Sequence, residues 1–191
     1  MARAVVLYAS HIGHTEKVAE YIAESVRKHD MPCDLLPVHS VPEDFGAYEA
    51  AIVVGSVHSG HHAAELADAI RRHAEAFRDM YTAFCSVSLE AAVVENADTV
   101  PARAEAEIEL HKPISHFLED TGWQPQLIEP VAGALPYSHV GPFRRLLLKQ
   151  LATDTGLTTD TSKDHVFTNW EALDGFVGAF CRRASVMPER L

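Results

Sequence analysis

Short apolar runs alternate along this chain with segments whose apolar residues recur at helical spacing, and this alternation most constrains the fold. Helical periodicity predicts five helices, at 15–29, 63–78, 102–119, 142–152 and 170–183. Apolar runs predict five strands, at 3–9, 33–38, 50–57, 81–89 and 126–135. Such alternation predicts a doubly wound α/β domain, with helices on both faces of a parallel sheet.

The domain organisation is expected to be simple. The 191 residues fit one ordinary domain, and neither an internal repeat nor a low-complexity linker divides them. We therefore predict a single domain over 1–191. The segment 136–164 is longer than a usual connection, and we interpret it as an insertion around the fifth strand. After it, 165–168 is expected to extend the sheet.

Composition limits the partners and the compartment. With 27 acidic and 16 basic residues the formal net charge is −11, which disfavours nucleic acid but not a small anionic ligand. Cys33, Cys85 and Cys181 lack a paired spacing, so we expect reduced thiols and a cytoplasmic protein. We expect no signal peptide, and no apolar stretch approaches the roughly 20 residues that span a bilayer.

The loop after the first strand is the first candidate site, since ligands of open α/β sheets bind at the carboxyl ends of the strands. It consists of Ser10, His11, Ile12, Gly13, His14 and Thr15. The hydroxyls of Ser10 and Thr15, with the free amides of the following helix, can hold a phosphate without Lys or Arg. An ordinary N-cap by Thr15 explains the same residues, and both interpretations stay open.

Two nucleotide motifs and one signalling fold can be set aside. The chain has no GxxxxGK[ST] and no GxGxxG after its first strand, which excludes a P-loop and the dinucleotide fingerprint. A response-regulator domain needs an acidic pocket at the ends of strands one and three. Those ends carry Ser10 and Gly55-Ser56 instead.

The spacing Ser10-x-x-Gly13-x-Thr15 resembles the phosphate loop of flavodoxins. Further segments that resemble one family follow in order, at 55–62, 83–89, 123–125, 132–137, 159–161 and 168–170. From about residue 4 to 180 the chain resembles the flavodoxin-like protoporphyrinogen oxidases, the FMN-containing, quinone-linked protoporphyrinogen IX dehydrogenases of heme synthesis. The resemblance implies a flavodoxin-like sheet of five parallel strands in the order 2-1-3-4-5.

The same resemblance implies a cofactor and its contacts. FMN would be bound noncovalently, with residues 10–15 around the phosphate. Two more loops would flank the flavin ring, through Ser56, Val57, His58, Ser59, Gly60, Ser86, Val87, Ser88 and Leu89. After the fifth strand, Tyr137 would either stack on the flavin or substrate or simply cover the core. The implied reaction oxidises protoporphyrinogen IX to protoporphyrin IX with a quinone as acceptor, and the flavin carries the redox chemistry.

Histidines 58, 61 and 62 form an H-x-x-H-H cluster in the second of these loops. Ring contact, proton transfer and metal binding are the functional alternatives, but a metal needs a third ligand with suitable geometry. We expect no metal. Family position puts His58 near the flavin as the candidate catalytic residue, while His61 and His62 are expected to begin a helix.

The segment 142–151 carries three bases and no acid. One hypothesis is a helix that faces a membrane or the substrate, so that Arg144 and Arg145 meet quinone or porphyrin propionates. This hypothesis adds peripheral contact with the inner face of the cell membrane. A surface helix with solvated bases fits the same pattern.

The segment 89–120 complicates the choice of substrate. It contains eight acidic residues, and its only bases are Arg103 and Lys112. If this acidic segment bordered the flavin, it would repel the carboxylates of a porphyrinogen. An FMN-dependent NAD(P)H:quinone reductase and a flavodoxin electron carrier without a substrate of its own therefore remain alternatives. A homodimer is a further hypothesis about partners.

Overall fold

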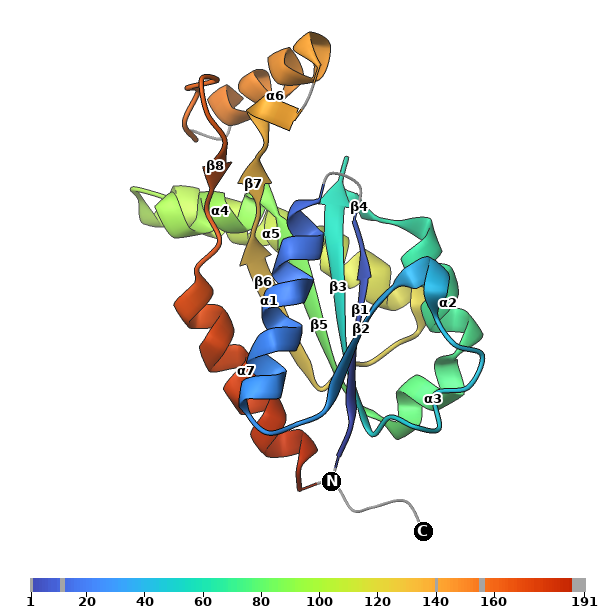
Figure 1. Ribbon diagram of the computed structural model, residues 1–191. Helices are drawn as coiled ribbons and strands as arrows, with labels where there is room; N and C mark the ends of the chain where they lie inside the picture. Colours follow the sequence, from blue (N-terminus) through green and yellow to red (C-terminus); the bar gives the residue numbers. More distant parts are fainter. Residues whose placement is uncertain (1, 11–12, 140, 155–156, 187–191) are drawn as a thin grey trace.

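The computed structural model describes residues 2–10, 13–139, 141–154 and 157–186. A parallel sheet stands between two layers of helices (Figure 1). Its strands run in the spatial order β2 (Cys33–Pro37), β1 (Ala4–Ala9), β3 (Ala50–His58), β5 (Tyr81–Ser88) and β6 (Leu127–Ala132). When these five parallel strands alone are numbered along the chain, their spatial order is 2-1-3-4-5. The predicted order is therefore confirmed.

Helices cover both faces of the sheet, as the alternation of the sequence predicted. Against one face pack α1 (His14–Lys28) and α7 (Trp170–Ala184). Against the other pack α2 (Ala64–Arg72), α3 (Ala74–Asp79) and α5 (Val100–Thr121), so Figure 1 shows the strands nearly enclosed. Every residue from Ala50 to Ser56 of β3 is buried, because this central strand is covered on both sides.

Aromatic rings concentrate on the α2–α5 side of the sheet. Phe84 of β5 is fully buried and stacks on Phe117 of α5, with ring centroids 5.0 Å apart. Trp123, after α5, meets Phe84 edge-on at 5.6 Å, and its indole Nε1 donates to Thr82 Oγ1 at 3.2 Å. These contacts join the end of α5 to the middle of the sheet.

Two local features of the helices differ from the sequence-based expectation. Ser88 ends β5 and its Oγ accepts from Ala91 N at 3.2 Å, which caps a helix that was not predicted, α4 (Leu89–Asn96). The predicted helix 63–78 is two helices, because His73 leaves the helical conformation between α2 and α3. The ring of His73 packs edge-on against Phe45 at 4.9 Å.

Residues 61 and 62 do not begin a helix, so that expectation is wrong. They form β4 (His61–His62), which pairs antiparallel with the end of β3 in the register Val57 with His62 and His58 with His61. The helix α2 begins only at Ala64. A short 3-10 helix, η1 (Val38–Ser40), follows β2.

The predicted fifth strand is divided by Gly133 into β6 and β7 (Ala134–Leu135). Pro130 is tolerated in β6 because this strand lies at the edge of the sheet. Antiparallel to β7 runs β8 (His165–Val166), so this pair brackets the segment 136–164. That segment holds η2 (Tyr137–His139) and α6 (Pro142–Asp154), which lie beyond the carboxyl ends of the strands (Figure 1).

All three cysteines are free and buried. Burial raises the pKa of Cys33 to about 12 and that of Cys181 to about 11, so both thiols are protonated near neutral pH. Within the described ranges, no helix combines the length and the apolar character that crossing a membrane requires.

Truncation of the central ring should test this packing. We expect Phe84→Ala to lower the free energy of unfolding by about 3–5 kcal/mol, because the lost ring leaves a cavity between Phe117 and Trp123. Ile108→Ala is the control: Ile108 is 60% exposed on α5 and should change stability by no more than about 0.5 kcal/mol. Urea unfolding measures both. Equal effects would contradict the packing described.

Candidate functional site

A cavity of about 350 Å³ opens at the carboxyl ends of the strands, a volume typical of small-molecule sites. From the residues predicted by sequence, it brings together His14, Thr15, Ser56, Val57, His58, Ser59, Gly60, Val87, Ser88 and Leu89. It adds Glu90, next to the predicted residue Leu89, and four residues that sequence reasoning missed, namely Gly133, Ala134, Pro136 and Leu148. The lining thus comes from four loops and from the insertion.

The first wall is the amino-terminal end of α1. Its N-cap is Gly13, in the left-handed conformation with φ of 89°, and no side chain caps the first turn. Thr15 lies inside the helix, so the interpretation of Thr15 as an N-cap is wrong. The first-turn amides and the positive end of the helix dipole are therefore directed at the cavity without a side-chain acceptor, which suits a phosphate group.

Ser10 supports this wall from the end of β1. Its Oγ accepts a hydrogen bond from Gly13 N at 3.1 Å, which leaves the hydroxyl hydrogen to donate elsewhere. The predicted contacts of His11 and Ile12 lie outside the described residues.

The second wall is the tight turn between β3 and β4. Ser59 and Gly60, its two central residues, both have positive φ, 51° and 79°. Two-residue turns of this kind match the twist of paired strands, so the backbone beside the cavity is held in one conformation. The neighbouring His58 lines the cavity, and its Nε2 lies 3.2 Å from Ser56 Oγ.

The third wall follows β5. Val87, Ser88 and Leu89 line the cavity, whereas the predicted contact Ser86 is not among its lining residues. Ser86 comes two residues before Ser88 in β5 and is fully buried. Its Oγ lies 3.3 Å from His62 Nε2. Gly133 approaches this wall closely: its N–H donates to Ser88 O at 2.8 Å, and an added Cβ would lie 3.3 Å from the same oxygen.

Tyr137 is placed differently from the expected flavin contact. Its side chain is fully buried among Leu135, Ala152 and Leu157, and it does not line the cavity. Of the two interpretations left open by the sequence, covering the core is the one that the structure supports. Pro136, just before η2, and Leu148 of α6 line the cavity instead.

The cavity lining carries little charge. Among its described residues Glu90 is the one carboxylate, and neither Lys nor Arg occurs. Burial, followed by the charge of Lys17, lowers the pKa of His14. The ring Nε2 of His14 lies 2.9 Å from Thr168 Oγ1, and Thr168 donates its own hydroxyl hydrogen to Ala132 O at 2.6 Å. His14 Nε2 therefore donates to Thr168, and the bond ties α1 to the segment before α7.

His62 lies beneath the site as a neutral, packed ring. Burial is the largest of the effects that lower its pKa to about 4. Its ring meets Phe84 and Phe117 edge-on at 5.0 and 5.1 Å. Over the described parts of the chain, no group of three His, Cys, Asp or Glu side chains is arranged to hold a metal ion.

The comparisons with known proteins agree on one family. The model of the flavodoxin domain family matches residues 5–162. Protoporphyrinogen IX dehydrogenase (quinone) of Escherichia coli (strain K12) is 27% identical over 175 residues, which cover 91% of this chain and 92% of that protein. The protein of the same name from Leishmania major is 28% identical over 190 residues, which cover 98% of this chain and 78% of that protein.

Solved structures support the fold. A flavodoxin from the domain Archaea superposes with a TM-score of 0.52 at 12% identity, over 96% of this chain and 99% of that chain. The rubredoxin oxygen:oxidoreductase of Desulfovibrio gigas gives 0.55 at 14% identity, over 96% of this chain and 36% of that chain. At such identities the likeness concerns the fold alone.

The buried ring of His62 predicts a pH dependence of stability. Its pKa is near 6.5 in the unfolded chain and about 4 in the folded protein, so between these values only the unfolded chain binds the proton. The free energy of unfolding should fall as the pH is lowered from 6.5 to 4, by up to about 3 kcal/mol from this group. Urea unfolding of His62→Gln should show a shallower slope. The exposed His61 is the control, and a His61→Gln slope as shallow as that of His62→Gln would contradict the assignment.

Proposed function

This chain belongs to the flavodoxin domain family, and from that premise we propose that it is an FMN-dependent dehydrogenase that oxidises protoporphyrinogen IX to protoporphyrin IX. A quinone accepts the electrons, and the reaction is a step of heme synthesis. The names of the relatives from Escherichia coli and Leishmania major supply this substrate and this acceptor. The alignments cover most of each chain and include the insertion 136–164.

One observation carries the choice of an enzyme over an electron carrier. The insertion contributes Pro136 and Leu148 to the lining, so the cavity has a roof as well as walls. A carrier that delivers electrons to partner proteins is expected to expose the edge of its flavin. A cavity that residues of 136–164 partly cover instead offers a substrate a surface to bind beside the flavin.

The residues of the cavity fit FMN. The first-turn amides of α1, the hydroxyl of Ser10 and that of Thr15 are the proposed donors to its phosphate, which needs no Lys or Arg. The Ser59–Gly60 turn and residues 87–89 are the proposed flanks of its ring, and Gly133 lines the cavity beside Ser88. FMN, when bound, supplies the two-electron redox chemistry. The protein orients the ring and its neighbours.

His58 is the proposed catalytic residue. It lines the cavity beside the turn that would flank the flavin, and its ring bonds to Ser56 Oγ, which fixes its orientation. Oxidation of a porphyrinogen releases protons as well as electrons. An imidazole at this position can accept a proton from the substrate and pass it to solvent.

The acidic segment 89–120 should repel the carboxylates of the substrate less than its sequence suggested. Of its eight acids, Glu90 is the one that lines the cavity. Glu107 and Glu119, by contrast, border a separate groove on the outer face of α5. Most of this negative charge therefore lies along helices away from the mouth of the site.

Arg145 is the proposed partner of a substrate propionate. It precedes Leu148 by three residues on α6, so the two share one face of the helix, and its Nε donates to Tyr137 O at 3.0 Å. The remaining guanidinium donors are the proposed contacts to the propionate. Leu146, 65% exposed on α6, is the proposed peripheral contact with the membrane that holds the quinone. The side chain of Arg144, the other basic candidate, lies outside the described residues.

The decisive experiment follows flavin reduction. Purified protein should be yellow or take up FMN, and protoporphyrinogen IX should bleach the flavin under anaerobic conditions faster than NADH or NADPH. Reoxidation by a quinone should regenerate the spectrum. A protein that cannot take up FMN would remove the basis of the proposal, and reduction by NAD(P)H alone would indicate the reductase instead. Reduction only by a partner protein would indicate the carrier.

Gly13 tests the phosphate site. We expect Gly13→Ala to weaken FMN binding about tenfold, because a side chain at φ of 89° costs about 1–2 kcal/mol and disturbs the N-cap. Gly175→Ala, in the interior of α7 with open space around the new methyl group, should bind FMN like the wild type. Fluorescence quenching of FMN measures both affinities. Equal affinities would exclude the α1 terminus as the phosphate site.

Arg145 tests the substrate contact. We expect Arg145→Gln to raise KM for protoporphyrinogen IX about tenfold, the loss of one charge-assisted hydrogen bond, without changing FMN content. Lys149→Gln removes an equal charge from an exposed position of α6 and should change KM little. Steady-state kinetics with a soluble quinone measures both. If the two variants behaved alike, the contact would be general electrostatic attraction and not recognition by Arg145.

A further inference from the structure

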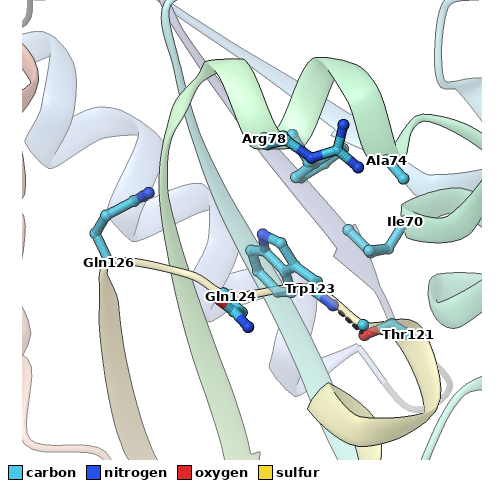
Figure 2. A pocket seen from close by; sticks show the side chains of 9 residues that line it. Ile70, Ala74, Arg78, Thr121, Trp123, Gln124 and Gln126 are labelled. Carbon is cyan, nitrogen blue, oxygen red and sulfur yellow. Dashed lines mark hydrogen bonds between the residues drawn. The ribbon is translucent and has the colours of Figure 1, made fainter.

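A second cavity, of about 380 Å³, lies at the other end of the sheet and shares no residue with the first. It opens between α3 and the chain that leads from α5 into β6, where β5 and β6 begin (Figure 2). On the α3 side it is lined by Ile70, Ala74 and Arg78, and on the other side by Thr121, Trp123 and Gln124. The proposed function leaves this cavity unused.

The apolar part of the cavity is bordered by side chains that are held in place by packing within the protein. Trp123 is 6% exposed, and its indole meets Phe77 edge-on at 5.7 Å. Its Nε1 donates to Thr82 Oγ1, so the plane of the indole is fixed before any ligand arrives. Ile70 and Ala74 oppose it across the space (Figure 2). A ligand that uses this wall loses little free energy to ordering side chains.

The polar part of the cavity consists of donors. Thr82 N–H and Thr82 Oγ1 both donate to Gln126 Oε1, at 2.6 and 3.1 Å, which leaves the Gln126 amide nitrogen as a donor. Gln124 adds a second amide at the rim. Among the described lining residues no carboxylate occurs, although the whole chain carries a net charge of −11.

Arg78 provides the one charge of this lining. It is exposed in the last turn of α3, and within the described parts of the chain no hydrogen bond or ion pair holds its guanidinium. Arg71, on the neighbouring helix α2, is instead engaged by both Asp68 and Asp120. A guanidinium without an acidic partner, in a lining that also carries two amide side chains and no carboxylate among its described residues, suits a carboxylate.

We propose that this cavity binds a small planar aromatic monocarboxylate, with its ring against Trp123 and its carboxylate on Arg78. The volume admits a fused two-ring system, and offset or edge-on ring contacts with the indole favour an aromatic body over an aliphatic one. A single Arg with neutral amide donors matches one carboxylate. A phosphate or a dicarboxylate would call for further cations, and among the described lining residues Arg78 is the one cation.

The test uses 2-naphthoate as the probe on FMN-loaded protein. The chain has two tryptophans, so the indole N–H signals of Trp123 and Trp170 can be followed separately in ¹H–¹⁵N spectra. We expect a saturable shift of the Trp123 signal alone, with an unchanged flavin spectrum. The neutral isostere 2-naphthamide should bind about tenfold more weakly, since it cannot form the charged pair.

Matched variants separate recognition from general attraction. Arg78→Gln should weaken 2-naphthoate binding about tenfold, whereas Arg72→Gln, an exposed arginine outside this cavity, should not. Ala74→Phe should fill the space and abolish binding of both probes without loss of FMN. The proposal would be overturned by equal binding of naphthoate and naphthamide, by an unaffected Arg78→Gln, or by shifts at Trp170 or the flavin. The last result would place the probe in the FMN site.

Discussion

The burial of β3 on both faces is the constraint on which the rest of the structure depends. A strand without a solvent face needs helices on both sides, and parallel neighbours need crossover connections. The connections fix the direction of every strand, so the loops after β1, β3, β5 and β6 all emerge at one edge of the sheet. The main cavity forms there because four independent loops converge, and none of them would form a site alone.

The main cavity can receive an anion without cationic side chains, because backbone amides at the start of α1 can bind it. Gly13 and Gly60 adopt left-handed conformations that turn α1 and the β3–β4 hairpin toward the same space. The terminal amides and the dipole of α1 are built into the fold, so they need no charged residue near the ligand. The net charge of −11 is therefore compatible with an FMN site. Much of the excess lies on α4 and α5, largely away from the lining.

Residues 136–164 partly cover the main cavity at the carboxyl edge of the sheet, through Pro136 and Leu148. The β7–β8 pair anchors both ends of residues 136–164, and the buried ring of Tyr137 holds the first turn of the insertion against the third core cluster. Through this anchor α6 places Leu148 over the cavity. The segment 136–164 therefore both packs against the third core cluster, through Tyr137, and lines the cavity, through Leu148.

The sequence by itself determined the strands, most helices, the strand order through its family resemblance, and the main residues of the cavity walls. Periodicity and glycine placement are local properties of the sequence. Whether a segment forms a strand or a helix depends mainly on its own residues. The tertiary structure alone decided that β4 and not a helix begins at His61, that Tyr137 turns into the core, and that Ser86 lies beneath the cavity. It also decided that Leu148 and Gly133 reach the site and that Arg78 and Trp123 line the same second cavity. These outcomes depend on contacts between residues far apart in the chain, and the free energy of such contacts is not encoded in any local pattern.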